Sequence, residues 1–166
     1  NKLIAGKDFF PYPYSANGKM EALPSIAVQE ADMPWFVDLK DALEENKTNP
    51  HFDLANYIYT NTKKAKDKGA TALIIYNSSA TDDKQACNGK DKSDVLSIPV
   101  LYMKKEAAAN YLKDPSATIN VKFNVSLSDK IRKGTNVVGY IDNGAATTVV
   151  LGAHFDHLGY GEDGNS

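Results

Sequence analysis

The chain has 166 residues, of which 42% are hydrophobic and 24% are charged, a composition typical of a folded globular protein. It carries 19 Lys and Arg against 21 Asp and Glu, and the basic residues are spread among the acidic ones, which argues against nucleic acid as a partner. Its single cysteine, Cys87, excludes an internal disulfide, and no apolar run approaches the length of a membrane span. The length suits one domain, or one domain and part of another.

The first 31 residues are rich in aromatic residues, Pro and Gly. Pro11 and Pro13 exclude a helix, and 15–18 is typical of a turn between short extended pieces. The aromatic residues of this segment either form a binding strip or pack an irregular entry segment onto the core, and we favour packing. They are Phe9, Phe10, Tyr12 and Tyr14.

Two helices are predicted next. Phe36, Leu39 and Leu43 recur at helical spacing among acidic residues, which predicts a short amphipathic helix after Met33-Pro34.

The second helix has clear start and stop signals. Asn49 is typical of an N-cap, Pro50 suits the first helical position, and Gly69 is typical of a helix end. We therefore expect a helix over 50–68, with its run of lysines on a solvated face.

Two further stretches predict strands. The run TALIIYN, at 71–77, is continuously apolar and predicts a buried strand directly after the helix. In 118–128, apolar and polar residues alternate strictly, which predicts a strand with one buried and one wet face. The polar, basic segment SDKIRKG follows, and we place a domain boundary there, between 1–128 and 129–166.

The last part of the chain predicts two strands around the Asn143-Gly144 turn signal. The second strand contains the apolar run 149–151, which is typical of burial on both faces. Gly152 and Ala153 then allow close approach of a ligand to the backbone.

A cluster of chemically active residues follows this run. In an extended chain His154 and Asp156 lie on one side, and His157 on the other. This spacing suits a metal-bound imidazole with the carboxylate that orients it. A His and an Asp that are simply hydrogen-bonded at a strand end fit the spacing equally well.

Three motifs together resemble one family. The string VVLGAHFDHLG, at 149–159, resembles the first metal-binding segment of the di-zinc exopeptidases related to bacterial leucyl aminopeptidase and glutamate carboxypeptidase. The runs KAKDKGATALIIYN, at 64–77, and SIPVLYMKKEAAANYL, at 97–112, resemble the protease-associated domain that is inserted in some of these enzymes.

The resemblance implies a mixed α+β fold: a protease-associated domain with a small sandwich-like or barrel-like sheet flanked by helices, then the opening strands of an α/β exopeptidase domain. It implies that His154 is a zinc ligand and that Asp156 is the catalytic-site carboxylate that orients it, while His157 receives no ligand role. The resemblance implies no other cofactor-binding residues.

The implied activity is that of a zinc-dependent aminopeptidase, in which two zinc ions hold the attacking water and a Glu acts as base. The other zinc ligands and the base are expected beyond Ser166, so we expect the isolated chain to be inactive. The resemblance also implies a peptide substrate and a secreted or periplasmic location. The alternative is a non-catalytic module that binds peptide or protein, and exposed strands give the chain a route to dimerisation.

Overall fold

The computed structural model describes residues 2–89, 91, 93–128 and 133–154. The chain divides into two units, Asn1–Asp129 and Lys130–Ser166, and this division lies within the basic connection noted in the sequence. The first unit mixes helices and strands, in agreement with an α+β protein.

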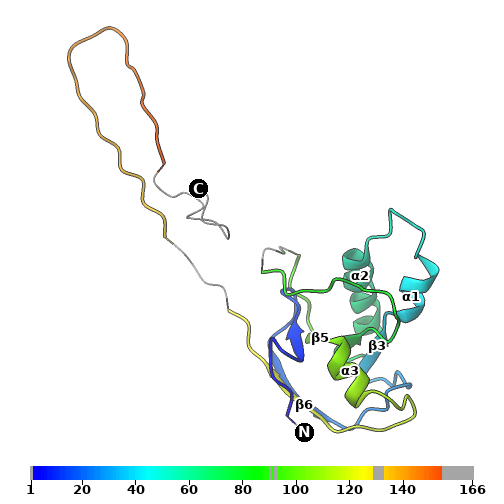
Figure 1. Ribbon diagram of the computed structural model, residues 1–166. Helices are drawn as coiled ribbons and strands as arrows, with labels where there is room; N and C mark the ends of the chain where they lie inside the picture. The colour runs from blue at the N-terminus through cyan, green and yellow to red at the C-terminus, as the bar shows by residue number, and fades with distance from the viewer. Residues whose placement is uncertain (1, 90, 92, 129–132, 155–166) are drawn as a thin grey trace. The chain divides into compact units, whose positions relative to one another are not determined.

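The elements follow one another in a mixed order (Figure 1). The strands are β1 (Phe9–Pro11), β2 (Gly18–Ala22), β3 (Pro34–Asp38), β4 (Ala72–Tyr76), β5 (Val100–Met103) and β6 (Val121–Val125). The helices are α1 (Lys40–Glu45), α2 (Leu54–Asp67) and α3 (Lys105–Tyr111).

The strands of the first unit form two sheets. The larger has the order β1-β5-β4-β3, in which β3, β4 and β5 are parallel and β1 is antiparallel to β5. The smaller consists of β2 and β6, paired antiparallel. The crossover from β3 to β4 contains α1 and α2, as parallel pairing requires a long connection.

Strand β4 lies at the centre of the core, and all five of its residues are buried. Leu73 and Ile75 belong to one apolar cluster together with Ile58 of α2. Ile74 belongs to a second cluster with Phe36 and Leu112, on the other face of the sheet. Alternate residues therefore serve opposite faces, and the predicted buried strand is confirmed.

The first predicted helix is partly wrong. Trp35 and Phe36 belong to strand β3, which pairs in parallel with β4, and the helix begins only at Lys40. Trp35 and Phe36 contribute to opposite apolar clusters, so both faces of β3 are covered. This two-sided burial outweighs the helical spacing of Phe36 and Leu39, because β-prone residues fill both faces of a sheet well.

The second predicted helix is present but begins later than expected. Helix α2 starts at Leu54, and Asp53 is its N-cap, with its carboxylate accepting a hydrogen bond of 2.9 Å from the Asn56 N–H. Asn49 instead accepts a hydrogen bond of 3.0 Å from the His51 N–H in a separate turn. The expected stop is confirmed at Gly69, whose φ of +98° is readily adopted only by glycine.

These two candidate caps give a testable difference. We expect Asp53→Ala to lower the free energy of unfolding by about 1 kcal/mol, because it leaves the first turn of α2 with an unsatisfied N–H. Asn49→Ala, at a solvent-exposed turn, is expected to change it by less than about 0.5 kcal/mol. Urea denaturation of both variants measures the difference, and a larger cost at Asn49 would move the helix start back to the Asn-Pro signal.

Two other expectations are confirmed. Phe10, Tyr12 and Tyr14 are buried, so this aromatic group packs onto the core. Strand β6 lies within 118–128, and Lys122 and Asn124 on its wet face are exposed.

In the second unit, the predicted strands around Asn143-Gly144 are absent from the described residues 133–154. Gly144 adopts a positive φ of +68°, and its N–H donates to the Asp142 carboxylate at 2.9 Å, so only this local contact accompanies the turn signal. The expected burial of 149–151 is wrong for this structure, because Leu151, for example, is 94% exposed. A buried strand needs backbone partners and covering side chains, and the described residues supply neither here.

Candidate functional site

The expected metal ligand His154 is an exposed residue at the end of the described part of the second unit. Asp156 and His157 lie outside the described residues, so the expected pairing of His154 with Asp156 stays a prediction. Among the described residues, no three His, Cys, Asp or Glu side chains gather where they could hold a metal ion. Zinc sites use three or four protein ligands, and His154 is the one expected ligand within the described residues, so no hydrolytic step is assigned to this part of the chain.

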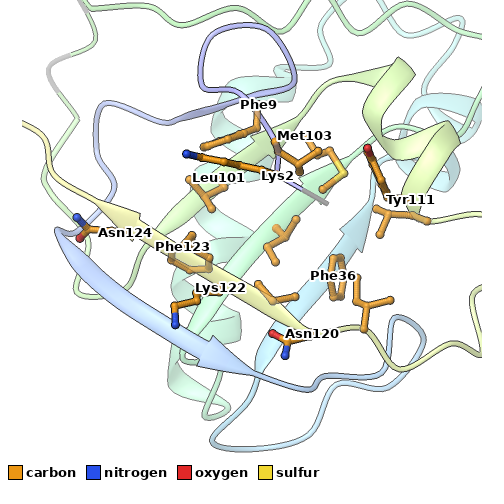
Figure 2. A pocket seen from close by; sticks show the side chains of 15 residues that line it. Lys2, Phe9, Phe36, Leu101, Met103, Tyr111, Asn120, Lys122, Phe123 and Asn124 are labelled. Carbon is orange, nitrogen blue, oxygen red and sulfur yellow. The ribbon is translucent and has the colours of Figure 1, made fainter.

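The first unit contains a large groove of about 660 Å³ between its two sheets. We call it the β6 groove, and it is lined by Lys2, Leu3, Phe9, Phe36, Ile74, Leu101, Met103, Tyr111, Leu112 and 119–124. Figure 2 shows β6 crossing in front of side chains from the larger sheet, with Phe9 and Met103 toward one end and Phe36 toward the other. Its volume lies within the range of pockets that hold small molecules or peptide side chains.

The groove exists because few residues cover this face of the sheet. Strand β6 contributes Val121 and Phe123, which pack against the second apolar cluster while remaining partly exposed. Helix α3 covers the remaining part with alanines, of which Ala107 and Ala108 are buried. Small side chains and a two-stranded sheet leave apolar floor residues such as Leu101 facing the groove.

The rim of the groove is polar and carries positive charge. Lys2, Asn120, Lys122 and Asn124 line it, and none of the lining residues is acidic. Lys122 forms an ion pair of 2.7 Å with Glu21 on β2, and both side chains are well exposed. Of the two lysines at the rim, Lys2 is therefore the better placed to attract an anionic group, because Lys122 is paired with Glu21.

A tyrosine cluster occupies the opposite face of the larger sheet. Tyr12 stacks on Tyr14 with ring centroids 5.1 Å apart, and Tyr14 meets Tyr59 edge-on at the same distance. The Tyr102 hydroxyl donates to the Asp83 carboxylate at 2.5 Å. The cluster is a packed part of the core, and this hydrogen bond links it to the loop that connects β4 and β5.

Burial controls the acidity of these tyrosines. It raises the pKa of Tyr12 well above its ordinary value, with smaller contributions from Tyr14, Tyr102 and Asp83. Burial also raises the pKa of Tyr14 and of Tyr102, and the hydrogen bond to Asp83 adds to the effect at Tyr102. All three hydroxyls therefore keep their protons at neutral pH.

Two hydroxyls of the cluster differ in their partners, which gives a second prediction. The Tyr14 hydroxyl is buried without a hydrogen-bond partner among the described residues, so Tyr14→Phe is expected to be neutral or stabilising by up to about 1 kcal/mol. Tyr102→Phe removes the hydrogen bond to Asp83 and is expected to cost about 1.5–3 kcal/mol. Thermal unfolding of the two variants measures this order, and a reversed order would contradict the assigned partners.

The acidic loop between β4 and β5 uses its carboxylates locally. Asp82, Asp83 and Asp91 each accept a hydrogen bond from a backbone N–H two residues further on, at 3.0, 3.0 and 2.8 Å. These side chains shape the loop's own turns.

The β6 groove was not predicted from the sequence. The alternation in 118–128 indicated an apolar face, but not that this face covers the sheet incompletely. The one available signal was the Ala-rich run at 107–109, because small side chains on a covering helix leave space beneath it.

Comparison with models of known families gives no match, and neither do comparisons with curated proteins and with solved structures. None of the helices in the described part of the chain has the length and apolar character needed to cross a membrane. The fold therefore defines the class only as a mixed α+β protein.

Proposed function

We propose that this chain is the protease-associated region and the opening catalytic strands of a zinc-dependent aminopeptidase. The proposal stands first on the motif VVLGAHFDHLG at 149–159, with His154 as a zinc ligand and Asp156 as the carboxylate that orients it. In this proposal His154 would hold zinc, and a complete metal centre would supply an activated water for hydrolysis. The remaining ligands and the general base belong to a longer form of the protein.

The structural observation that carries the proposal is the exposure of the segment before His154. Six aliphatic side chains in 137–151 are each at least 83% exposed: Val137, Val138, Ile141, Val149, Val150 and Leu151. Exposed aliphatic side chains gathered in one segment in this way are typical of a surface that other protein covers. Strands that complete the sheet of a catalytic domain have this character.

The same proposal extends to the substrate and the compartment. Peptides with a free N-terminus are the proposed substrates, and a secreted or periplasmic location is proposed. His154 would contribute an imidazole nitrogen to zinc, and Asp156 would fix its tautomer and raise its basicity.

The test uses the longest natural form of the gene product and an aminoacyl anilide substrate. His154→Ala is expected to abolish hydrolysis while leaving the unfolding transition of the first unit unchanged. Asp156→Asn is expected to weaken zinc binding about 10–100-fold, because the imidazole loses its orienting partner.

His51 is the matched control, because it lies exposed in the turn before α2. His51→Ala is expected to retain full activity and zinc content. Hydrolysis that survives His154→Ala would overturn the ligand assignment. Unchanged zinc affinity in Asp156→Asn would leave Asp156 without a role in the site.

The β6 groove favours a second candidate function, that of a non-catalytic module that binds peptide. The unit Asn1–Asp129 has its own apolar core and carries the groove on its surface. Binding by this unit requires no zinc. The absence of hydrolysis together with peptide binding would favour this second function.

A further inference from the structure

Strand β6 has a neighbour on one side only. It pairs with β2 from Gly18 opposite Val125 to Ala22 opposite Val121, and the small sheet has no third strand among the described residues. In an antiparallel pair, alternate residues direct their N–H and C=O groups away from the partner strand. The second edge of β6 therefore offers a row of backbone donors and acceptors.

This open edge runs along the β6 groove. Six consecutive residues, 119–124, line the groove, which means that the backbone of β6 follows it rather than touching it at one point. Figure 2 shows β2 alongside one edge of β6, with Lys122 on that side. The labelled side chains of the larger sheet, Phe9, Leu101, Met103 and Phe36, lie beyond the other edge. Hydrogen-bonding groups and an apolar floor therefore lie side by side.

The side chains of the groove floor and rim limit the kinds of ligand that fit the β6 groove. Phe36, Leu101 and Met103 provide apolar surface for side chains at alternate positions of an extended chain. Lys2 at the rim favours a carboxylate, because no acidic residue lines the groove and Lys122 is already paired with Glu21. The five residues of β6 span about 17 Å at a rise of about 3.4 Å per residue, so they match a peptide of similar length.

We propose that the open edge of β6 captures an extended peptide as a third strand, with its alternate apolar side chains in the β6 groove and a carboxylate near Lys2. This inference deepens the second candidate function, on which it rests, and it is independent of zinc. Main-chain hydrogen bonds supply affinity in such strand addition, and the groove supplies specificity.

The probe is the peptide Thr-Val-Thr-Val-Thr-Val-Glu with a fluorescent label at its N-terminus, titrated against the whole chain by fluorescence anisotropy. Two N-methylated versions follow, one at the Val nitrogens and one at the Thr nitrogens. In a strand, alternate N–H groups point to opposite edges, so one set faces β6 and the other faces solvent. One version is expected to bind at least about tenfold more weakly and the other to retain its affinity.

Two variants locate the site on the protein. Lys2→Gln is expected to weaken binding about threefold, and less at high salt, because an exposed charge contributes modestly. The matched control is Lys64→Gln, at an exposed position on α2. Met103→Trp, which fills the groove, is expected to weaken binding at least about tenfold, with near-ultraviolet circular dichroism verifying that the fold is retained.

The outcomes separate the mode of binding from the binding function. If no version of the peptide binds, the second candidate function fails together with this inference. If the two N-methylated peptides bind equally, a binding function stands but strand addition is overturned. If size-exclusion chromatography shows a dimer that the peptide does not dissociate, a second copy occupies the edge and the proposed occupant is wrong.

Discussion

Raising the pH above about 10 is expected to unfold this protein steeply, because Tyr12, Tyr14 and Tyr102 are buried with their protons on. Burial raises the pKa of each of the three in the folded state. Above the ordinary pKa of tyrosine the unfolded chain releases these protons while the folded chain retains them, so the free energy of unfolding falls as pH rises. Their contribution is complete below about pH 10.

The slope of this loss is large. Each retained proton contributes about 1.4 kcal/mol per pH unit, so three tyrosines together contribute up to about 4 kcal/mol per pH unit. Urea denaturation at a series of pH values measures the slope through the fluorescence of the single tryptophan, Trp35, which is itself buried.

A pair of variants tests whether the cluster causes the slope. Tyr12→Phe removes one of these protons and is expected to lower the slope by about 1.4 kcal/mol per pH unit. Tyr140→Phe, at a site 73% exposed, is expected to leave it unchanged, since this hydroxyl meets solvent in both states. Equal slopes in the two variants would mean that the tyrosine cluster is not the source of the alkaline unfolding.

The second large effect is expected from a pair of leucines. Leu73→Ala is expected to lower the free energy of unfolding by about 3–5 kcal/mol, because Leu73 is 1% exposed at the centre of β4 and its loss leaves a cavity. Leu151→Ala is expected to change it by less than about 0.5 kcal/mol, because Leu151 is 94% exposed. Both residues lie in continuous apolar runs, so only their surroundings differ.

Chemical denaturation of both variants in the whole chain measures this difference. A cost of 2 kcal/mol or more at Leu151, roughly that of a core leucine, would mean that 149–151 is buried in solution. Comparable small costs at both positions would contradict the central place of β4.

The elements whose signals lie in neighbouring residues of the sequence were predicted well. The apolar run at 71–77 correctly predicted β4, and the alternation in 118–128 correctly predicted β6. A continuous apolar run indicates a strand buried on both faces, and alternation indicates a strand buried on one face. Gly69 ended α2 as expected, since a positive φ is a local requirement.

The elements whose bounds depend on packing against distant parts of the chain were predicted less well. The helical spacing of Phe36 and Leu39 did not reveal that β4 would pair with 34–38 as a strand. The cap of α2 moved to Asp53, because Asn49 and Pro50 formed a turn of their own. Residues 34–38 could form a helix or a strand, and either Asn49 or Asp53 could cap α2. Tertiary packing determined which of the two formed in each place.

The candidate site divides in the same way. The proposal for His154 and Asp156 depends on a motif and stays a prediction, since Asp156 lies outside the described residues. The β6 groove depends on parts of the chain as distant as Lys2, Met103 and Phe123, which only the fold brings together. Because its residues are far apart in the sequence, such a site leaves no motif of fixed spacing by which it could be predicted.

The position of Asn124 on the groove wall has a practical consequence for producing the protein. Asn124, Val125 and Ser126 form an acceptor sequence for N-linked sugar, and the Asn124 side chain is exposed. A eukaryotic secretory host would place a bulky glycan there, on the wall of the β6 groove. Material from such a host would have a covered groove, whereas material from a bacterial cytoplasm would have a bare one.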